Sequence, residues 1–124
     1  MKHRINNGCC CDNPANHFSD GSFYSLFVGL NDKCTRTQAM PSKQAMIFVE
    51  DVCARYFVNG YTILEGRGAD QGTPTKIEPS VYIMAINATE SEVFQVANIL
   101  QEKFNQSEIL IEQNKTRYLY FNNN

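Results

Sequence analysis

The sequence lacks the features that would point to nucleic acid or a membrane as a partner. Among its 124 residues, 11 Lys and Arg nearly balance 13 Asp and Glu, which leaves a formal net charge of −2 and a pI of about 5.6. Such a chain has no overall electrostatic attraction to polynucleotides or to anionic lipid. Its apolar runs are also far shorter than a membrane span. We therefore expect neither a nucleic acid polymer nor a membrane as a partner.

Histidine is scarce, and the cysteines are unevenly placed. The basic residues at positions 1–4 are not followed by the apolar segment of a secretory signal, so we expect a cytoplasmic protein with reduced thiols. Three of the five cysteines are adjacent, at Cys9–Cys11, and the two histidines are His3 and His17. Adjacent thiolates do not easily occupy three tetrahedral positions, so we expect no metal and no cofactor. A structural zinc site is the less favoured alternative.

What the chain does contain is a β-α-β pattern that occurs twice. Short apolar runs predict strands, two stretches of helical periodicity predict helices, and Thr89–Glu92 matches a capping box. This order favours an α+β, ferredoxin-like βαββαβ fold, with a four-stranded antiparallel sheet and two helices on one face. The predicted strands are Phe23–Leu30, Tyr61–Leu64, Ile77–Ile86 and Glu108–Phe121, and the predicted helices are Ser42–Val58 and Ser91–Phe104.

Two of these strands carry further expectations. Phe23–Leu30 is apolar at successive positions, which is typical of a central strand buried on both faces. The last strand has Asn114–Lys115 near its middle, where a break into a hairpin is an alternative. Its end, Tyr118–Phe121, is also apolar at successive positions, which indicates that a partner covers it.

The chain divides into an arm and one domain. Residues 1–21 are polar and lack periodicity, which indicates a flexible N-terminal arm, and residues 22–121 form a single domain. A small core with eight Phe and six Tyr often gains burial by association of copies. We therefore expect a homo-oligomer.

The predicted topology brings three connections to one end of the sheet. They are the loop at 31–40, the hairpin at 65–76 and the turn at 105–106. Arg67 lies between two glycines, and the loop at 31–40 ends at a helix N-terminus; both features favour an anion. We expect Arg67, Lys33 and Arg36 to contact phosphates. The alternative is a solvated hairpin tip and a solvated loop.

Other residues are expected to complete a ligand site. Amide and carboxylate groups of Asn31, Asp32 and Gln106 would bind sugar or base, Tyr82 would stack on it, and Arg117 would act at a subunit boundary. The candidate ligand-binding residues are Asn31, Asp32, Lys33, Arg36, Glu65, Arg67, Tyr82, Gln106 and Arg117.

Residues for catalysis are less evident. Glu65 and Glu78 flank the predicted hairpin and would be an acid and base pair in a small enzyme. A nucleophilic Cys34 would need a histidine to activate its thiol, and both histidines precede the predicted domain. We therefore expect no catalytic residues and a protein that is not an enzyme.

The stretches LFVGLND, GYTILEGRG and EPSVYIM within Tyr24–Gln113 carry a resemblance. They resemble a group of small bacterial and phage proteins with an uncharacterised domain, and the architecture is similar to that of PII-like signalling proteins, whose sequence motifs are missing here. The chain also resembles phage anti-defence sponges of the anti-Thoeris type. These resemblances imply a non-enzymatic oligomer that binds, and sequesters, a small anionic, nucleotide-like signal. The alternative is a protein-interaction module that inhibits a host or phage enzyme.

Overall fold

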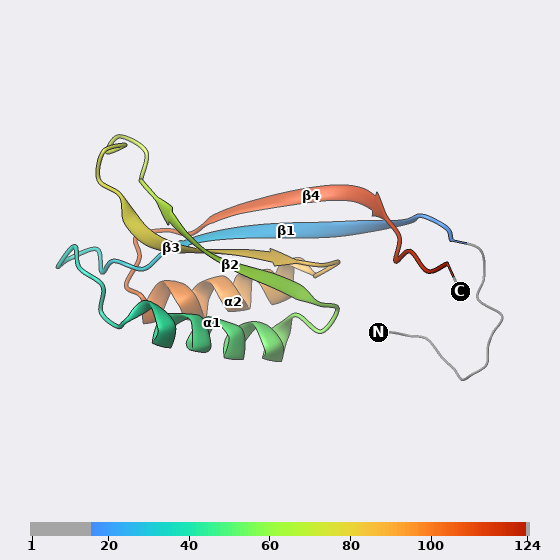
Figure 1. The fold of residues 1–124 in the computed structure, drawn as a ribbon, viewed down its shortest axis with the longest axis horizontal. Coiled ribbons are helices and arrows are strands. Elements are labelled where there is room, and N and C mark those ends of the chain that lie inside the picture. The colour runs from blue at the N-terminus through green and yellow to red at the C-terminus, as the bar shows by residue number, and fades with distance from the viewer. Residues whose placement is uncertain (1–15, 124) are drawn as a thin grey trace.

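The computed structural model describes residues 16–123. Its sheet has the strand order β2-β3-β1-β4, every neighbouring pair is antiparallel, and both helices lie on one side of it (Figure 1). The predicted ferredoxin-like α+β fold is confirmed. The elements are β1 (Ser19–Gly29), α1 (Ser42–Tyr56), β2 (Tyr61–Gly68), β3 (Glu78–Ala85), α2 (Glu90–Lys103) and β4 (Leu110–Tyr118).

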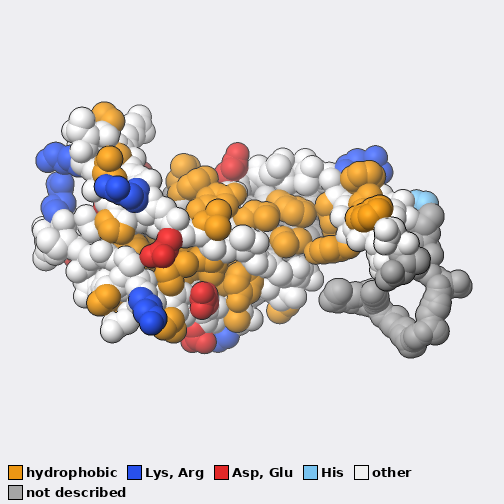
Figure 2. Space-filling model, in the orientation of Figure 1, with side chains coloured by type: hydrophobic (Ala, Val, Ile, Leu, Met, Phe, Trp, Pro, Cys, Tyr) orange, Lys and Arg blue, Asp and Glu red, His pale blue; other side chains and the backbone are white. Residues whose placement is uncertain are grey.

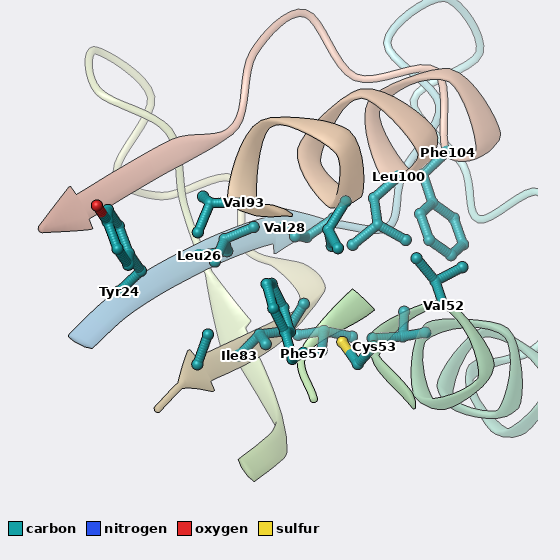
Figure 3. Packing of buried hydrophobic residues seen from close by; sticks show 14 of the residues in the cluster. Tyr24, Leu26, Val28, Val52, Cys53, Phe57, Ile83, Val93, Leu100 and Phe104 are labelled. Atoms are coloured by element: carbon teal, nitrogen blue, oxygen red, sulfur yellow. The ribbon is translucent and has the colours of Figure 1, made fainter. Parts of the chain in front are cut away.

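The hydrophobic core fills the space between the sheet and the helices. Alternate residues of β1, among them Leu26 and Val28, point to the helices and are fully buried, as is Ile83 of β3 (Figure 3). The helices contribute residues at helical spacing, for example Leu100 and Phe104 at the end of α2. This packed core fixes the positions of the strands, and with them the positions of the strand ends and of the loops that leave them.

The other face of the sheet is open, which corrects the expectation of a strand buried on both faces. Phe27 of β1 is 42 % exposed, and Leu64 and Leu110 on the outer strands are 56 % and 66 % exposed. Their registers place all three in one row across the open face with Tyr82. Figure 2 shows hydrophobic side chains gathered along the strands at the surface.

Several boundaries differ from the sequence prediction because strand pairing extends them. β2 continues to Gly68, so Arg67 lies in a paired strand and not at a flexible hairpin tip. β4 is continuous, because Asn114 and Lys115 pair with β1, so no hairpin forms there. β1 already begins at Ser19, within the stretch expected to be an arm. The expectations for the cysteines at 9–11 lie outside the described residues.

The N-terminus of α2 carries the predicted capping box. The Thr89 Oγ1 accepts a hydrogen bond from the Glu92 N–H at 3.1 Å, and a Glu92 carboxylate oxygen accepts one from the Thr89 N–H at 2.9 Å. We expect Thr89→Ala to lower the free energy of unfolding by about 1 kcal/mol, because one N–H loses its acceptor. Urea unfolding followed by circular dichroism measures this. Thr73→Ala, in the β2–β3 connection, is the control and should change stability by less than about 0.5 kcal/mol.

None of the helices within residues 16–123 is long and apolar enough to cross a membrane.

Candidate functional site

Two connections are fastened together at one end of the sheet. The Asp32 carboxylate accepts a hydrogen bond from the Asn105 amide at 3.0 Å, and the Lys33 N–H donates to the Asn105 carbonyl at 3.0 Å. Asn105 has a φ of 48°, which is the left-handed region that asparagine tolerates better than most residues. The structure thus brings the β1–α1 loop against the α2–β4 turn, as the topology predicts.

The Asp32 carboxylate is occupied mainly by hydrogen bonds within its own loop. Besides Asn105, it accepts hydrogen bonds from the N–H groups of Cys34, at 2.7 Å, and Thr35, at 3.1 Å. These bonds, led by that of Asn105 and assisted by the charge of Lys33, lower the pKa of Asp32 below its ordinary value. Asp32 therefore shapes the loop, while Lys33 and Arg36 are exposed on it.

A second cluster ties the same loop to β3. The Asn31 N–H donates to the Glu78 carboxylate at 3.0 Å, and the Gln106 side-chain amide donates to the carbonyls of Asn31 and Phe104. Asn31 also bridges to Gln38 across the loop. The loop residues Asn31 and Asp32 and the turn residue Gln106 are therefore close together, as expected from the sequence.

A pocket of about 420 Å³ lies where the ends of β2 and β3 meet the start of α1. Glu65 and Arg67 lie opposite Val81 and Pro79, so both side chains project on the helix side of the sheet. The N-cap residue of α1 is Pro41, whose side chain has no hydrogen-bond acceptor. The N–H groups in the first turn of α1 therefore have no side-chain cap. The lining residues are Leu30, Ser42, Glu65, Gly66, Arg67, Ile77, Glu78, Pro79 and Ser80.

The pocket therefore offers both signs of charge. Arg67 and the N-terminus of α1 favour an anionic group, and Glu65 favours a cationic one. Sequence reasoning missed Ser42 and Ser80, although Ser42 follows the proline that marks the helix start. Ser80 carries no signal of its own in the sequence, because only strand pairing brings it beside Gly66.

Glu65 and Glu78 both line this pocket, but they start from opposite faces of the sheet. Glu65 projects with Val81 on the helix side, whereas Glu78 lies opposite Gly68 in the alternate row, on the open side. Among residues 16–123, no group of three His, Cys, Asp or Glu side chains is placed to hold a metal ion.

Tyr82 and Arg117 lie away from this end of the sheet or on its other face. Tyr82 is on the open face, where its hydroxyl hydrogen-bonds Ser25 at 2.9 Å and its ring packs 5.2 Å from that of Phe27. Arg117 is near the far end of β4, 3.7 Å from Asp20. Within one chain, neither residue joins the pocket that contains Arg67.

Arg117 instead belongs to a second hollow of about 520 Å³ at the opposite end of the sheet. The β1–β4 register places Lys115 and Arg117 in one row with Ser22 and Asp20. Lys115 has no ion-pair partner among residues 16–123. The hollow is lined by Asp20, Gly21, Ser22, Asn87, Lys115, Thr116 and Arg117.

Comparison with known proteins gives likeness in fold alone. No known protein family and no curated protein matches the sequence. The structure is similar to a phage SAM lyase in its apo state, with a TM-score of 0.54 and 20% identity over 84% of this chain and 91% of that one. It is also similar to CPII from Thiomonas intermedia K12, a nitrogen regulatory PII-like protein. The TM-score is 0.50 for apo CPII, with 14% identity over 86% of this chain and 99% of that one.

CPII bound to ADP, AMP and acetate matches with a TM-score of 0.52 and 14% identity, over 82% of this chain and 91% of that one. The expected likeness to PII-like proteins thus holds for the fold, and a phage protein shares it. The expectation that the protein is not an enzyme is wrong, because a phage lyase has the same fold, and the fold therefore does not argue against catalysis. The chain has a PII-like, ferredoxin-like fold that is shared by a phage enzyme and a nucleotide-binding protein.

Proposed function

We propose that this protein is a homo-oligomer that captures an adenosine-containing small molecule in the pocket around Glu65 and Arg67, and that it cleaves S-adenosylmethionine (SAM) there. The observation that carries the proposal is the pairing of an anion-binding side, Arg67 and the start of α1, with the Glu65 carboxylate. The volume of about 420 Å³ lies in the range of about 300–1,000 Å³ typical of small-molecule sites. The fold likeness to a SAM lyase supports the choice of substrate.

The charges of SAM match those of the pocket. SAM carries a carboxylate at one end of its amino-acid part, together with two cationic groups, an ammonium and a sulfonium. Arg67 and the α1 N–H groups would hold the carboxylate, and Glu65 would lie near a cationic centre.

Cleavage by a lyase makes modest demands on the protein. An oxygen of the substrate's own carboxylate attacks the carbon attached to sulfur and closes a lactone ring, while the bond from that carbon to sulfur breaks with its electron pair going to sulfur. The sulfonium charge and the carboxylate charge both disappear, and the neutral S-methyl-5′-thioadenosine leaves. No water is consumed, and no protein nucleophile is needed. This suits a pocket that has no cysteine or histidine in its lining. The task of Glu65 and Arg67 is then to bind and orient the substrate.

An anionic nucleotide is the second ligand class for the same end of the sheet. Lys33 and Arg36 lie on the β1–α1 loop and Arg67 lies near the end of β2, at the same end of the sheet, and such cations favour phosphates. CPII, which shares the fold, is bound to ADP and AMP. Capture without turnover would give the sequestering role that the sequence resemblance implies.

Association of copies would account for two features that lie outside the pocket, an apolar row on the open face and Arg117. The exposed apolar row of Phe27, Leu64 and Leu110 favours burial against another copy. Arg117 cannot reach the pocket of its own chain, since it lies at the far end of the sheet. As a ligand contact, it would have to act from a neighbouring copy.

The test is incubation of the purified chain with SAM, followed by chromatography and mass spectrometry of the products. We expect release of S-methyl-5′-thioadenosine, and we expect Glu65→Gln to slow it at least about 100-fold, because the carboxylate charge near the cationic centre is lost. Glu50→Gln, an exposed position on α1, is the matched control and should keep the parent rate.

Intact SAM after prolonged incubation would overturn the cleavage. Calorimetric titration with ADP and AMP, on the parent chain and Arg67→Ala, then tests the binding half. Binding of an unaltered nucleotide that weakens in Arg67→Ala would leave capture as the function. Absence of any binding would favour the protein-interaction module instead.

A further inference from the structure

We propose that the hollow at the far end of the sheet binds a small phosphate anion, held by Lys115 and Arg117 of one chain. The anion is inorganic phosphate or the phosphate group of an ester. This site goes beyond the proposed function, because it lies at the opposite end of the sheet from the pocket of Glu65 and requires no turnover. It also gives Arg117 a ligand that does not depend on a neighbouring copy.

The hollow begins where the core ends. On the helix side of β1, the buried residues Leu26 and Tyr24 are followed at alternate positions by Ser22 and Asp20, which are not buried. The Tyr24 hydroxyl accepts a hydrogen bond from the Gln113 amide at 2.8 Å, at the margin of the core. Figure 1 shows β1 and β4 continuing past the ends of both helices. Within residues 16–123, the helix side of this projecting ribbon therefore has no helix over it.

Two cationic side chains project from β4 on this side. Lys115 lies opposite Ser22, and Arg117 lies opposite Asp20, so both share the face of the buried Tyr24. Residues two positions apart on a strand are separated by roughly 7 Å, which two long side chains can span to meet one ligand. Their mutual repulsion falls when an anion lies between them.

The hollow holds too few carboxylates to balance these charges. The Arg117 guanidinium lies 3.7 Å from the Asp20 carboxylate, but the two side chains are 69 % and 95 % exposed, so the pair is weak. Lys115 has no ion-pair partner in the described part of the chain. The lining therefore carries one positive charge in excess.

A fixed wall and a free hydroxyl complete the site. The Asn87 side chain accepts the Ser22 N–H at 3.3 Å and donates to the Tyr118 hydroxyl at 3.3 Å, so it bridges across β1. Gly21 permits this bridge, since a methyl group there would lie 2.6 Å from the Tyr118 ring. The Ser22 hydroxyl hydrogen-bonds to none of residues 16–123, and it can donate to a ligand oxygen.

The chemistry of this set of groups selects phosphate. A guanidinium donates two parallel N–H bonds to phosphate oxygens, an ammonium adds a point charge, and a hydroxyl adds one further donor. The volume of about 520 Å³ leaves room beside a phosphate for a group esterified to it. Inorganic phosphate and methyl phosphate are therefore the probes, the first for the free anion and the second for an ester.

The test is titration at constant ionic strength, followed by NMR of the Ser22 backbone amide and the Asn87 side-chain amide. We expect phosphate to shift both signals in a saturable way, with a dissociation constant in the millimolar range, and sodium chloride to leave them unchanged. Lys115→Gln should weaken binding about fivefold or more. Lys43→Gln is the matched control, because it changes the net charge equally at an exposed position of α1 and should keep the parent affinity.

A second variant should strengthen binding. Asp20→Asn removes the carboxylate that competes with the ligand for Arg117, so we expect phosphate to bind about twofold more tightly or better. Because this effect is a gain of affinity, it cannot arise from a loss of folding.

Parent-like binding by Lys115→Gln, or equal shifts with sodium chloride, would overturn the proposal. So would phosphate shifts confined to Gly66 beside Arg67, since these report the other pocket. Methyl phosphate that binds as tightly as phosphate would identify an ester as the ligand, whereas methyl phosphate that does not compete would identify the free anion. Failure of SAM cleavage would affect none of these outcomes.

Discussion

Phe104→Ala is expected to lower the free energy of unfolding by about 3–5 kcal/mol. The Phe104 ring is 1 % exposed, and it packs edge-on against Phe48 of α1 with ring centroids 6.0 Å apart. Removing the ring leaves a cavity between the two helices at the end where the candidate site lies. Since the sequence contains no tryptophan, urea unfolding is best followed by circular dichroism at the helix band.

The matched control for this variant is Phe94→Ala. Phe94 lies on the same helix, but its side chain is 58 % exposed, so its removal should cost less than about 1 kcal/mol. Because Phe104 directly precedes the turn at 105–106, we also expect the loss of its packing to loosen the turn that holds Gln106. Equal losses in the two variants would contradict the packing described for α2.

Cys34 and Cys53 are expected to differ in alkylation rate by at least about 1,000-fold at pH 8. Cys53 is buried in the core, and this burial raises the pKa of its thiol to about 12, whereas Cys34 is exposed in the β1–α1 loop. Alkylation requires the thiolate, which is about one part in 10⁴ for a thiol with a pKa four units above the pH. Iodoacetamide labelling followed by peptide mass spectrometry separates the two cysteines from those at positions 9–11.

Unfolding the chain in concentrated urea provides the control, because it should bring the rate at Cys53 close to that at Cys34. A Cys53 that is labelled as fast as Cys34 in the native protein would mean that α1 does not pack on the sheet as described. A fast reaction at Cys34 alone would not indicate a functional role for that residue, since Cys34 is not among the residues that line the pocket.

The order of elements was predictable from local patterns. Apolar residues at helical spacing and the capping box at Thr89 depend only on neighbours within a few positions, and α2 forms where they indicate. Strand ends were less predictable, because β2 reaches Gly68 only through its pairing with Glu78. The Gly66–Gly68 tripeptide therefore looks like a loop in the sequence and is a strand in the fold.

By itself, the sequence determined the βαββαβ order, and with it that Asn31, Arg67 and Gln106 lie at the same end of the sheet. Only the tertiary structure decided which face each side chain occupies: Glu65 on the helix side, Glu78 on the open side, and Arg117 at the far end. The physical reason is that side chains alternate across a strand, so a shift of one residue in register moves each of them to the other face. Register is set by contacts between distant segments, which the local sequence does not encode.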